Sequence, residues 1–219
     1  MQSGRSGFVA FVVAAATVAL VSLRGRMRIG ALVLLTVLVA TVFAASPRLQ
    51  ERYALGVKEL RTVSDLQEVT SMGIRTVIWD STRDLIEARP VLGYGLGGFA
   101  PAYAMRIAQN YSEGWRATPV ADPHNQYLFL WAEAGLPGLL AFLLFLLALW
   151  RQRPPTACGA TGIALVVAWC ATSMFSSHFQ TFNEGHLIAL FIGVFLARER
   201  PGLVQSVSAI ASAASSTAA

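Results

Sequence analysis

Residues 122–150 read DPHNQYLFLWAEAGLPGLLAFLLFLLALW, and this stretch determines which fold class the chain can adopt. From Tyr127 to Trp150 it is almost wholly apolar, and a helix of that length reaches across the ~30 Å hydrocarbon core of a bilayer. The residues before Tyr127 are polar and carry the signals of a helix start. The stretch therefore predicts a polar loop that turns into a membrane-spanning helix.

The whole chain has the composition of a polytopic membrane protein. Of its 219 residues, 55% are hydrophobic and only 13% are charged, which is far from the average for a soluble domain. Apolar segments that could cross a membrane recur along the chain, the last of them short: 8–23, 29–45, 127–150, 159–175 and 186–197.

The basic residues are distributed unevenly and indicate an orientation. Residues 46–125 contain nine Lys or Arg and nine Asp or Glu, so this segment is neutral. Apart from Arg5, the other basic residues lie at three junctions that five alternating spans place on one side: Arg24, Arg26, Arg28, Arg151, Arg153, Arg198 and Arg200. The positive-inside rule makes that side cytoplasmic. The net charge of +5 thus reports orientation, and no basic–aromatic surface pattern indicates nucleic-acid binding.

These patterns divide the chain into four parts. We expect two transmembrane helices in 1–45, a periplasmic loop in 46–125, three transmembrane helices in 126–200 and a disordered, Ala- and Ser-rich cytoplasmic tail in 201–219. The predicted fold class is all-α: a polytopic membrane protein with about five transmembrane helices and a large helical extracytoplasmic loop between spans 2 and 3. Within the loop, apolar spacing and helix breakers predict helices over 47–63, 71–88 and 102–111.

His124 is the first candidate for chemistry. Asp122 is a good N-cap and Pro123 suits the first helical position, so His124 is expected in the first helical turn. The positive end of the helix dipole favours a neutral imidazole there, which can accept a proton. The alternative is an interfacial polar residue that caps its own helix.

Two further features of the sequence also need an explanation. Glu133 lies about 13 Å further along the same helix, where an ionisable group usually faces the bundle interior with a partner. It either links to a polar group on another helix or faces a substrate. The glycines of residues 93–98 match no nucleotide fingerprint and predict a tight, backbone-close turn, with anion contact as the alternative.

Four further residues are candidates for binding an anion or completing a pocket. Arg75 and Trp79 share one side of the helix predicted over 71–88. The planar fork of arginine suits a diphosphate, but an arginine on an amphipathic helix is also commonly solvated, so the residues alone leave Arg75 undecided. His178 lies on the outward side and either completes a pocket or caps the interface. Arg5, at the outer end of the first span, either snorkels to the interface or helps to bind a phosphate.

The order of these motifs carries a resemblance. The matching residues are Ser3-Gly4-Arg5-Ser6-Gly7, Arg75-x-x-x-Trp79, the run RPVLGYGLGGF from Arg89 to Phe99, His124-Asn125-x-x-Leu128 and Glu133-x-Gly135-Leu136-x-Gly138. Over about residues 3–197 the chain resembles the C-terminal part of the O-antigen ligase and polymerase-like family. The resemblance implies an integral-membrane glycosyltransferase of the bacterial inner membrane. Its substrates would be an undecaprenyl-diphosphate-linked glycan and an acceptor glycolipid or glycan, such as lipid A-core, at the periplasmic face.

The resemblance also implies roles for individual residues. His124 is the expected general base, and Arg75 and Arg5 are expected to hold the diphosphate. The residues of a possible pocket are Glu133, Asn125, Trp79 and His178. No metal and no cofactor is expected, because arginines supply the charge stabilisation. The alternatives are a polymerase that joins repeat units, and a non-catalytic protein that binds the glycan or the lipid carrier.

The number of spans departs from the family's pattern, because its members usually carry many more than five. We therefore expect a fragment, a split subunit or an inactive remnant, with a missing N-terminal half or a partner subunit to supply further helices. Apart from such a subunit, membrane lipids and the two glycan substrates are the expected partners, and nucleic acid is not.

Overall fold

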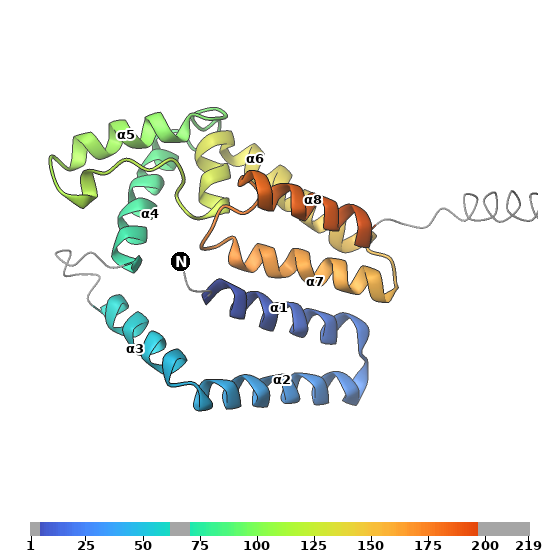
Figure 1. Ribbon diagram of the computed structural model, residues 1–219. Helices are drawn as coiled ribbons and strands as arrows, with labels where there is room; N and C mark the ends of the chain where they lie inside the picture. Colours follow the sequence, from blue (N-terminus) through green and yellow to red (C-terminus); the bar gives the residue numbers. More distant parts are fainter. Residues whose placement is uncertain (1–4, 62–70, 197–219) are drawn as a thin grey trace, which may run out of the picture.

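The computed structural model describes residues 5–61 and 71–196, and every regular element in these ranges is a helix, as the all-α prediction requires. In chain order the elements are α1 (Arg5–Ser22), α2 (Gly25–Ala45), α3 (Pro47–Arg61), α4 (Ser71–Ala88), α5 (Phe99–Asn110), the short 3-10 helix η1 (Trp115–Ala117), α6 (Gln126–Gln152), α7 (Ala157–Thr172) and α8 (Phe182–Leu196) (Figure 1). The tail predicted over 201–219 lies outside the described residues.

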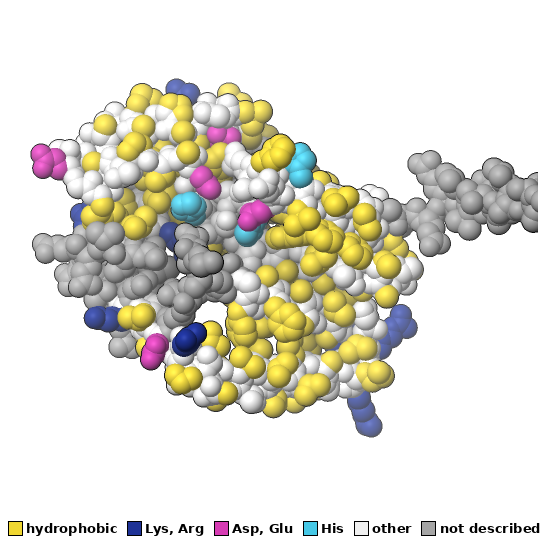
Figure 2. Space-filling model, viewed as in Figure 1, with side chains coloured by type: hydrophobic (Ala, Val, Ile, Leu, Met, Phe, Trp, Pro, Cys, Tyr) yellow, Lys and Arg dark blue, Asp and Glu magenta, His cyan; other side chains and the backbone are white. Residues whose placement is uncertain are grey.

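The five predicted spans correspond to α1, α2, α6, α7 and α8. In the described ranges, α2 and α6 are long and apolar enough to cross a membrane, whereas α7, α8 and the apolar part of α1 (Gly7–Ser22) are shorter. α1 packs along α7, and α7 packs along α8. α2 has no buried residue, and its Leu34 side chain is 69% exposed. Figure 2 shows broad apolar surface over these helices, which suits contact with lipid. The exact number of spans stays a prediction.

The apolar helices are arranged so that the polar segments meet at one end. Figure 1 shows α1, α6 and α8 beginning at the end where α2 and α7 finish. α3, α4 and α5 lie at this same end. The connection from α7 to α8 and the residues before α6 therefore lie on the same side of the bundle as α4.

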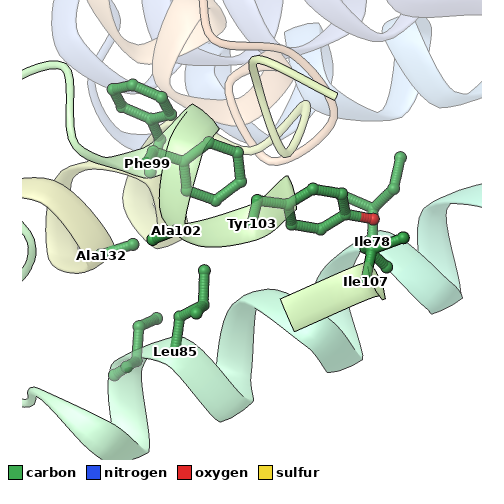
Figure 3. Packing of buried hydrophobic residues seen from close by; sticks show 9 residues of the cluster. Ile78, Leu85, Phe99, Ala102, Tyr103, Ile107 and Ala132 are labelled. Carbon is green, nitrogen blue, oxygen red and sulfur yellow. The ribbon is translucent and has the colours of Figure 1, made fainter. Parts of the chain in front are cut away.

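α4, α5 and the first turns of α6 share a hydrophobic core (Figure 3). Phe99, Tyr103 and Ile107 recur every four residues on one face of α5 and are almost completely buried. They pack against α4 and α6, and the Phe99 and Tyr103 rings stack with centroids 5.4 Å apart. Burial raises the pKa of Tyr103 to about 12. The predicted helix 71–88 matches α4, whereas α5 begins three residues before the predicted 102.

α6 is divided by a kink at Gly135. This residue has φ 64° and ψ −168°, a conformation that is essentially confined to glycine, and Pro137 follows it. Leu136 donates its backbone N–H to the Pro90 carbonyl at 3.1 Å, and the Trp131 indole N–H donates to the same oxygen at 3.0 Å. The kink therefore leaves the Leu136 backbone N–H available to the segment that follows α4.

The glycine-rich segment 90–98 packs directly against that kink. Tyr94 and Gly95 donate their backbone N–H groups to the carbonyls of Ala132 and Glu133, each at 2.9 Å. A Cβ added at Gly135 would lie 1.9 Å from the Val91 carbonyl oxygen, so the two backbones meet where no side chain fits. The tight turn predicted for these glycines is present, and its partner is the backbone of α6.

Candidate functional site

The start of α6 differs from the prediction. Asn125, and not Asp122, is the N-cap: its Oδ1 accepts the backbone N–H groups of Tyr127 at 3.0 Å and Leu128 at 3.2 Å. The prediction that His124 lies in the first helical turn was therefore wrong, because His124 precedes the cap. The physical reason is that Asp122 Oδ1 accepts the His124 backbone N–H at 2.7 Å, in an Asx turn that competes with helix formation.

The backbone of His124 has an uncommon conformation. Its φ of 53° is in the left-handed region, and it is the one non-glycine residue with positive φ in the described ranges. Residues held in sparsely populated conformations cluster at functional sites. The His124 side chain is 51% exposed, and its Nδ1 lies 3.7 Å from Oδ2 of Asp122. The imidazole thus faces solvent on one side and a carboxylate on the other.

The start of α6 and the loop before it are tied to the α7–α8 connection by three hydrogen bonds. The Ser177 hydroxyl donates to Asp122 Oδ1 at 2.5 Å, the Gln126 backbone N–H donates to the Ser173 carbonyl at 2.9 Å, and the Phe179 backbone N–H donates to Gln126 Oε1 at 3.1 Å. Ser177, Gln126 and Ser173 are buried. Ser177 therefore binds the Asp122 side chain directly, and the two Gln126 bonds hold the start of α6 against the same connection.

α4 brings two of the predicted site residues to the same place. The Trp79 indole N–H donates to the Pro123 carbonyl at 2.9 Å, next in the chain to His124. The Trp79 ring lies 6.1 Å from the ring of Phe175, and Arg75 Cζ lies 5.9 Å from the centroid of that same ring. Arg75 and Trp79 thus both lie near Phe175 of the α7–α8 connection, and Trp79 also binds the residue before His124.

The remaining predicted pocket residues have structural contacts. Glu133 is buried, and its Oε1 accepts the backbone N–H of Phe99 at 3.3 Å, so its observed partner is the start of α5 and not the loop at His124. Asn125 is buried as the cap described above. His178 lies beside Ser177 in the α7–α8 connection, and its Nδ1 is 2.7 Å from Glu184 Oε2.

Arg5 is the first residue of α1, and α1 begins at the end of the bundle where α6 begins (Figure 1). On the face shown in Figure 2, histidine and acidic side chains gather between the apolar helices and the segment of α4 and α5.

Comparison with known proteins assigns a family to this arrangement. Residues 1–143, more than half of the chain, match a family model described as O-antigen ligase. The chain belongs to the O-antigen ligase family. It is also similar to an uncharacterized protein of Haemophilus influenzae, with 32% identity over 80 residues. That alignment covers 36% of this chain and 19% of the relative, so the chain spans about a fifth of the relative's length.

The O-antigen ligase match contains α1 to α6 up to residue 143, and hence Arg5, Arg75 and His124. It ends before α7, so Ser177 and His178 lie beyond the matched residues.

Sequence reasoning missed two contributors to the site. Ser177 and Phe175 give no local signal, since Ser177 reaches Asp122 across 55 residues of sequence. The role of the Asp122 carboxylate had a usable signal, because an aspartate two residues before a histidine fits an Asx turn as well as a helix cap.

Proposed function

We propose that this member of the O-antigen ligase family is an integral-membrane glycosyltransferase. It transfers a glycan from undecaprenyl diphosphate to a sugar hydroxyl of lipid A-core or a similar acceptor, at the periplasmic face of a bacterial inner membrane. The observation that carries the proposal is the Trp79–Pro123 hydrogen bond, which fixes the helix of Arg75 against the loop of His124. The family match and the apolar helices α2 and α6 support it.

His124 acts as the general base. Its half-exposed imidazole takes the proton from the acceptor hydroxyl while that oxygen attacks the anomeric carbon. The bond from the anomeric carbon to the diphosphate breaks, and its electron pair leaves with the undecaprenyl diphosphate. Proton transfer to a positioned side chain contributes about 10²–10⁴-fold to such a rate.

Arg75 and Arg5 stabilise the leaving group. The Arg75 guanidinium lies against the Phe175 ring, and an arginine held by an aromatic ring keeps a planar fork of donors for two phosphate oxygens. Arg5, the first residue of α1, is the second arginine that we assign to the diphosphate. Charge placed in advance around the departing diphosphate lowers the barrier without any reorganisation during the reaction.

The base is tested in membranes that contain the full chain, a labelled undecaprenyl-diphosphate-linked glycan and an acceptor. His124→Ala should lower the transfer rate by about 100-fold or more. The matched control is His186→Ala, since His186 is an exposed histidine of α8 whose Nδ1 contacts the Phe182 carbonyl. Transfer at the wild-type rate by the His124 variant would remove the proposed base.

The diphosphate clamp, by which we mean Arg75 and Arg5, is tested separately by measuring binding of the labelled carrier. Arg75→Ala should weaken binding, while Arg83→Ala, which removes an exposed arginine from the same helix, should not. Equal binding by wild type and the Arg75 variant contradicts the clamp.

Product analysis separates the alternative functions. Label in lipid A-core indicates a ligase, and longer lipid-linked chains indicate a polymerase. Carrier binding with no transfer to any acceptor would refute the glycosyltransferase and leave a binding protein.

A further inference from the structure

The two oxygens of Asp122 make different contacts. Oδ1 accepts the backbone N–H of His124 at 2.7 Å and the Ser177 hydroxyl at 2.5 Å. Oδ2 lies on the side of the imidazole, 3.7 Å from Nδ1 of His124. Because two donors from separate segments hold Oδ1, the direction in which Oδ2 points is set independently of the imidazole itself.

A histidine that acts as a general base must have an unprotonated ring nitrogen facing the acceptor hydroxyl. A neutral imidazole carries its proton on one ring nitrogen and accepts through the other, and the partner of one nitrogen decides which is which. A carboxylate beside Nδ1 favours the tautomer that is protonated there, since a carboxylate only accepts. Nε2, at the other edge of the half-exposed ring, then carries the lone pair.

We propose that Asp122 is a positioning residue for His124. Its carboxylate selects the Nδ1-protonated tautomer, so that Nε2 receives the proton of the acceptor hydroxyl, and it stabilises the imidazolium formed in that step. The same carboxylate holds His124 in its left-handed backbone conformation through the Asx turn. This inference rests on the proposed function of His124.

Substitution of Asp122 separates positioning from simple structural support. In Asp122→Asn the amide oxygen still accepts both hydrogen bonds, but an N–H donor replaces Oδ2 beside Nδ1. That donor favours the opposite tautomer, which blocks Nε2. Asp122→Ala removes the support and the charge together but supplies no wrong donor.

The decisive result is therefore which of the two variants has the lower kcat. We expect Asp122→Asn to lower kcat by roughly 10–100-fold, at least as much as Asp122→Ala, with little change in KM for the carrier. That range is well below the effect of a buried triad aspartate, because both side chains here are partly exposed. Asp80→Asn, the same change at an exposed position of α4, is the control and should transfer at the wild-type rate. Better activity in the Asn variant than in the Ala variant would show that only the hydrogen bonds matter and would overturn the proposal.

A second readout does not depend on activity. Nitrogen-15 NMR of labelled histidine at pH 8, where an ordinary imidazole is neutral, distinguishes the two tautomers. The signals of the chain's three histidines are assigned with the variants His178→Ala and His186→Ala. We expect the Nδ1-protonated form for His124 in the wild type and the Nε2-protonated form in Asp122→Asn. The Nε2-protonated form in both proteins overturns the proposal.

Failure of this inference can be told from failure of the proposed function. Full activity of His124→Ala removes the base and the positioning role together. Loss of activity in His124→Ala with full activity in Asp122→Asn removes the positioning role alone. If both act in one step, adding Asp122→Asn to His124→Ala should cause no further loss, and an additive loss contradicts the coupling.

Discussion

Replacing Gly135 with alanine should destabilise the contact between α6 and the glycine-rich turn 90–98. The added Cβ would lie 1.9 Å from the Val91 carbonyl oxygen and 2.5 Å from its carbonyl carbon. Both are backbone atoms, so no side-chain rotation relieves the overlap. The turn has to move away from α6 by more than an ångström.

The magnitude follows from what that movement breaks. Three backbone hydrogen bonds join the turn to the kink, at 2.9, 2.9 and 3.1 Å, and each contributes about 1 kcal/mol. A non-glycine residue at φ 64° and ψ −168° costs a further 1–3 kcal/mol or so. We therefore expect the free energy of unfolding to fall by roughly 4–6 kcal/mol.

The free energy of unfolding is measured by denaturation in detergent micelles, with Gly95→Ala as the matched control. Gly95 also has a positive φ, of 87°, but a Cβ there meets nothing within 4 Å. The control should lose only the backbone term, about 1–2 kcal/mol. Equal losses in the two variants would refute the close approach of the two backbones.

Three smaller predictions concern the same segment of the protein. Trp79→Phe keeps an aromatic side chain but loses the indole hydrogen bond to Pro123. It should lower the free energy of unfolding by about 1 kcal/mol and lower glycan transfer several-fold; unchanged values in both assays contradict the role of that bond. Arg106→Gln removes the 2.6 Å ion pair with Asp84, whose side chains are more than a third exposed, so the cost should stay below about 1 kcal/mol, and a loss above 2 kcal/mol or so would be too large for a surface pair. Burial raises the pKa of Tyr103 from 10.0 to about 12, so folding favours the neutral phenol. The contribution of this group to the free energy of unfolding is therefore complete below pH 10 and is lost as the pH rises through 12. Between pH 9 and pH 11.5 the free energy of unfolding should therefore fall more in the wild type than in Tyr103→Phe. An equal fall in both proteins would contradict the raised pKa.

Local signals predicted the elements well where one pattern dominated. The helix expected over 71–88 has those bounds because apolar spacing fixes its body and Pro90 limits its end. Each of the five apolar segments largely coincides with a helix for the same reason. The start of α6 was misplaced by three residues because Asp122 and Asn125 are both good caps, and the Asx turn at His124 decided between them.

The site itself could be predicted only in part. Arg75, Trp79 and His124 were selected from the sequence, and the hydrogen bond from Trp79 to Pro123 now brings their segments together across 44 residues of sequence. No local pattern specifies that contact, or the one between Asp122 and Ser177. The partner of Glu133 was equally hidden, because a free backbone N–H at the start of α5 leaves no trace in side-chain chemistry.

The kink at Gly135 also has a mechanical consequence for the surrounding lipid. It leaves only residues 136–150 of α6 as an uninterrupted apolar rod, and α7 and α8 are similarly short, with 16 and 15 residues. Rods of 15–16 residues rise about 22–24 Å, several ångströms less than the hydrocarbon thickness of a typical bilayer. A bilayer adapts to such hydrophobic mismatch by thinning locally. Under the proposed function, thinning would draw the carrier's diphosphate inward toward the bundle end that holds His124, which would make acyl-chain length a determinant of turnover.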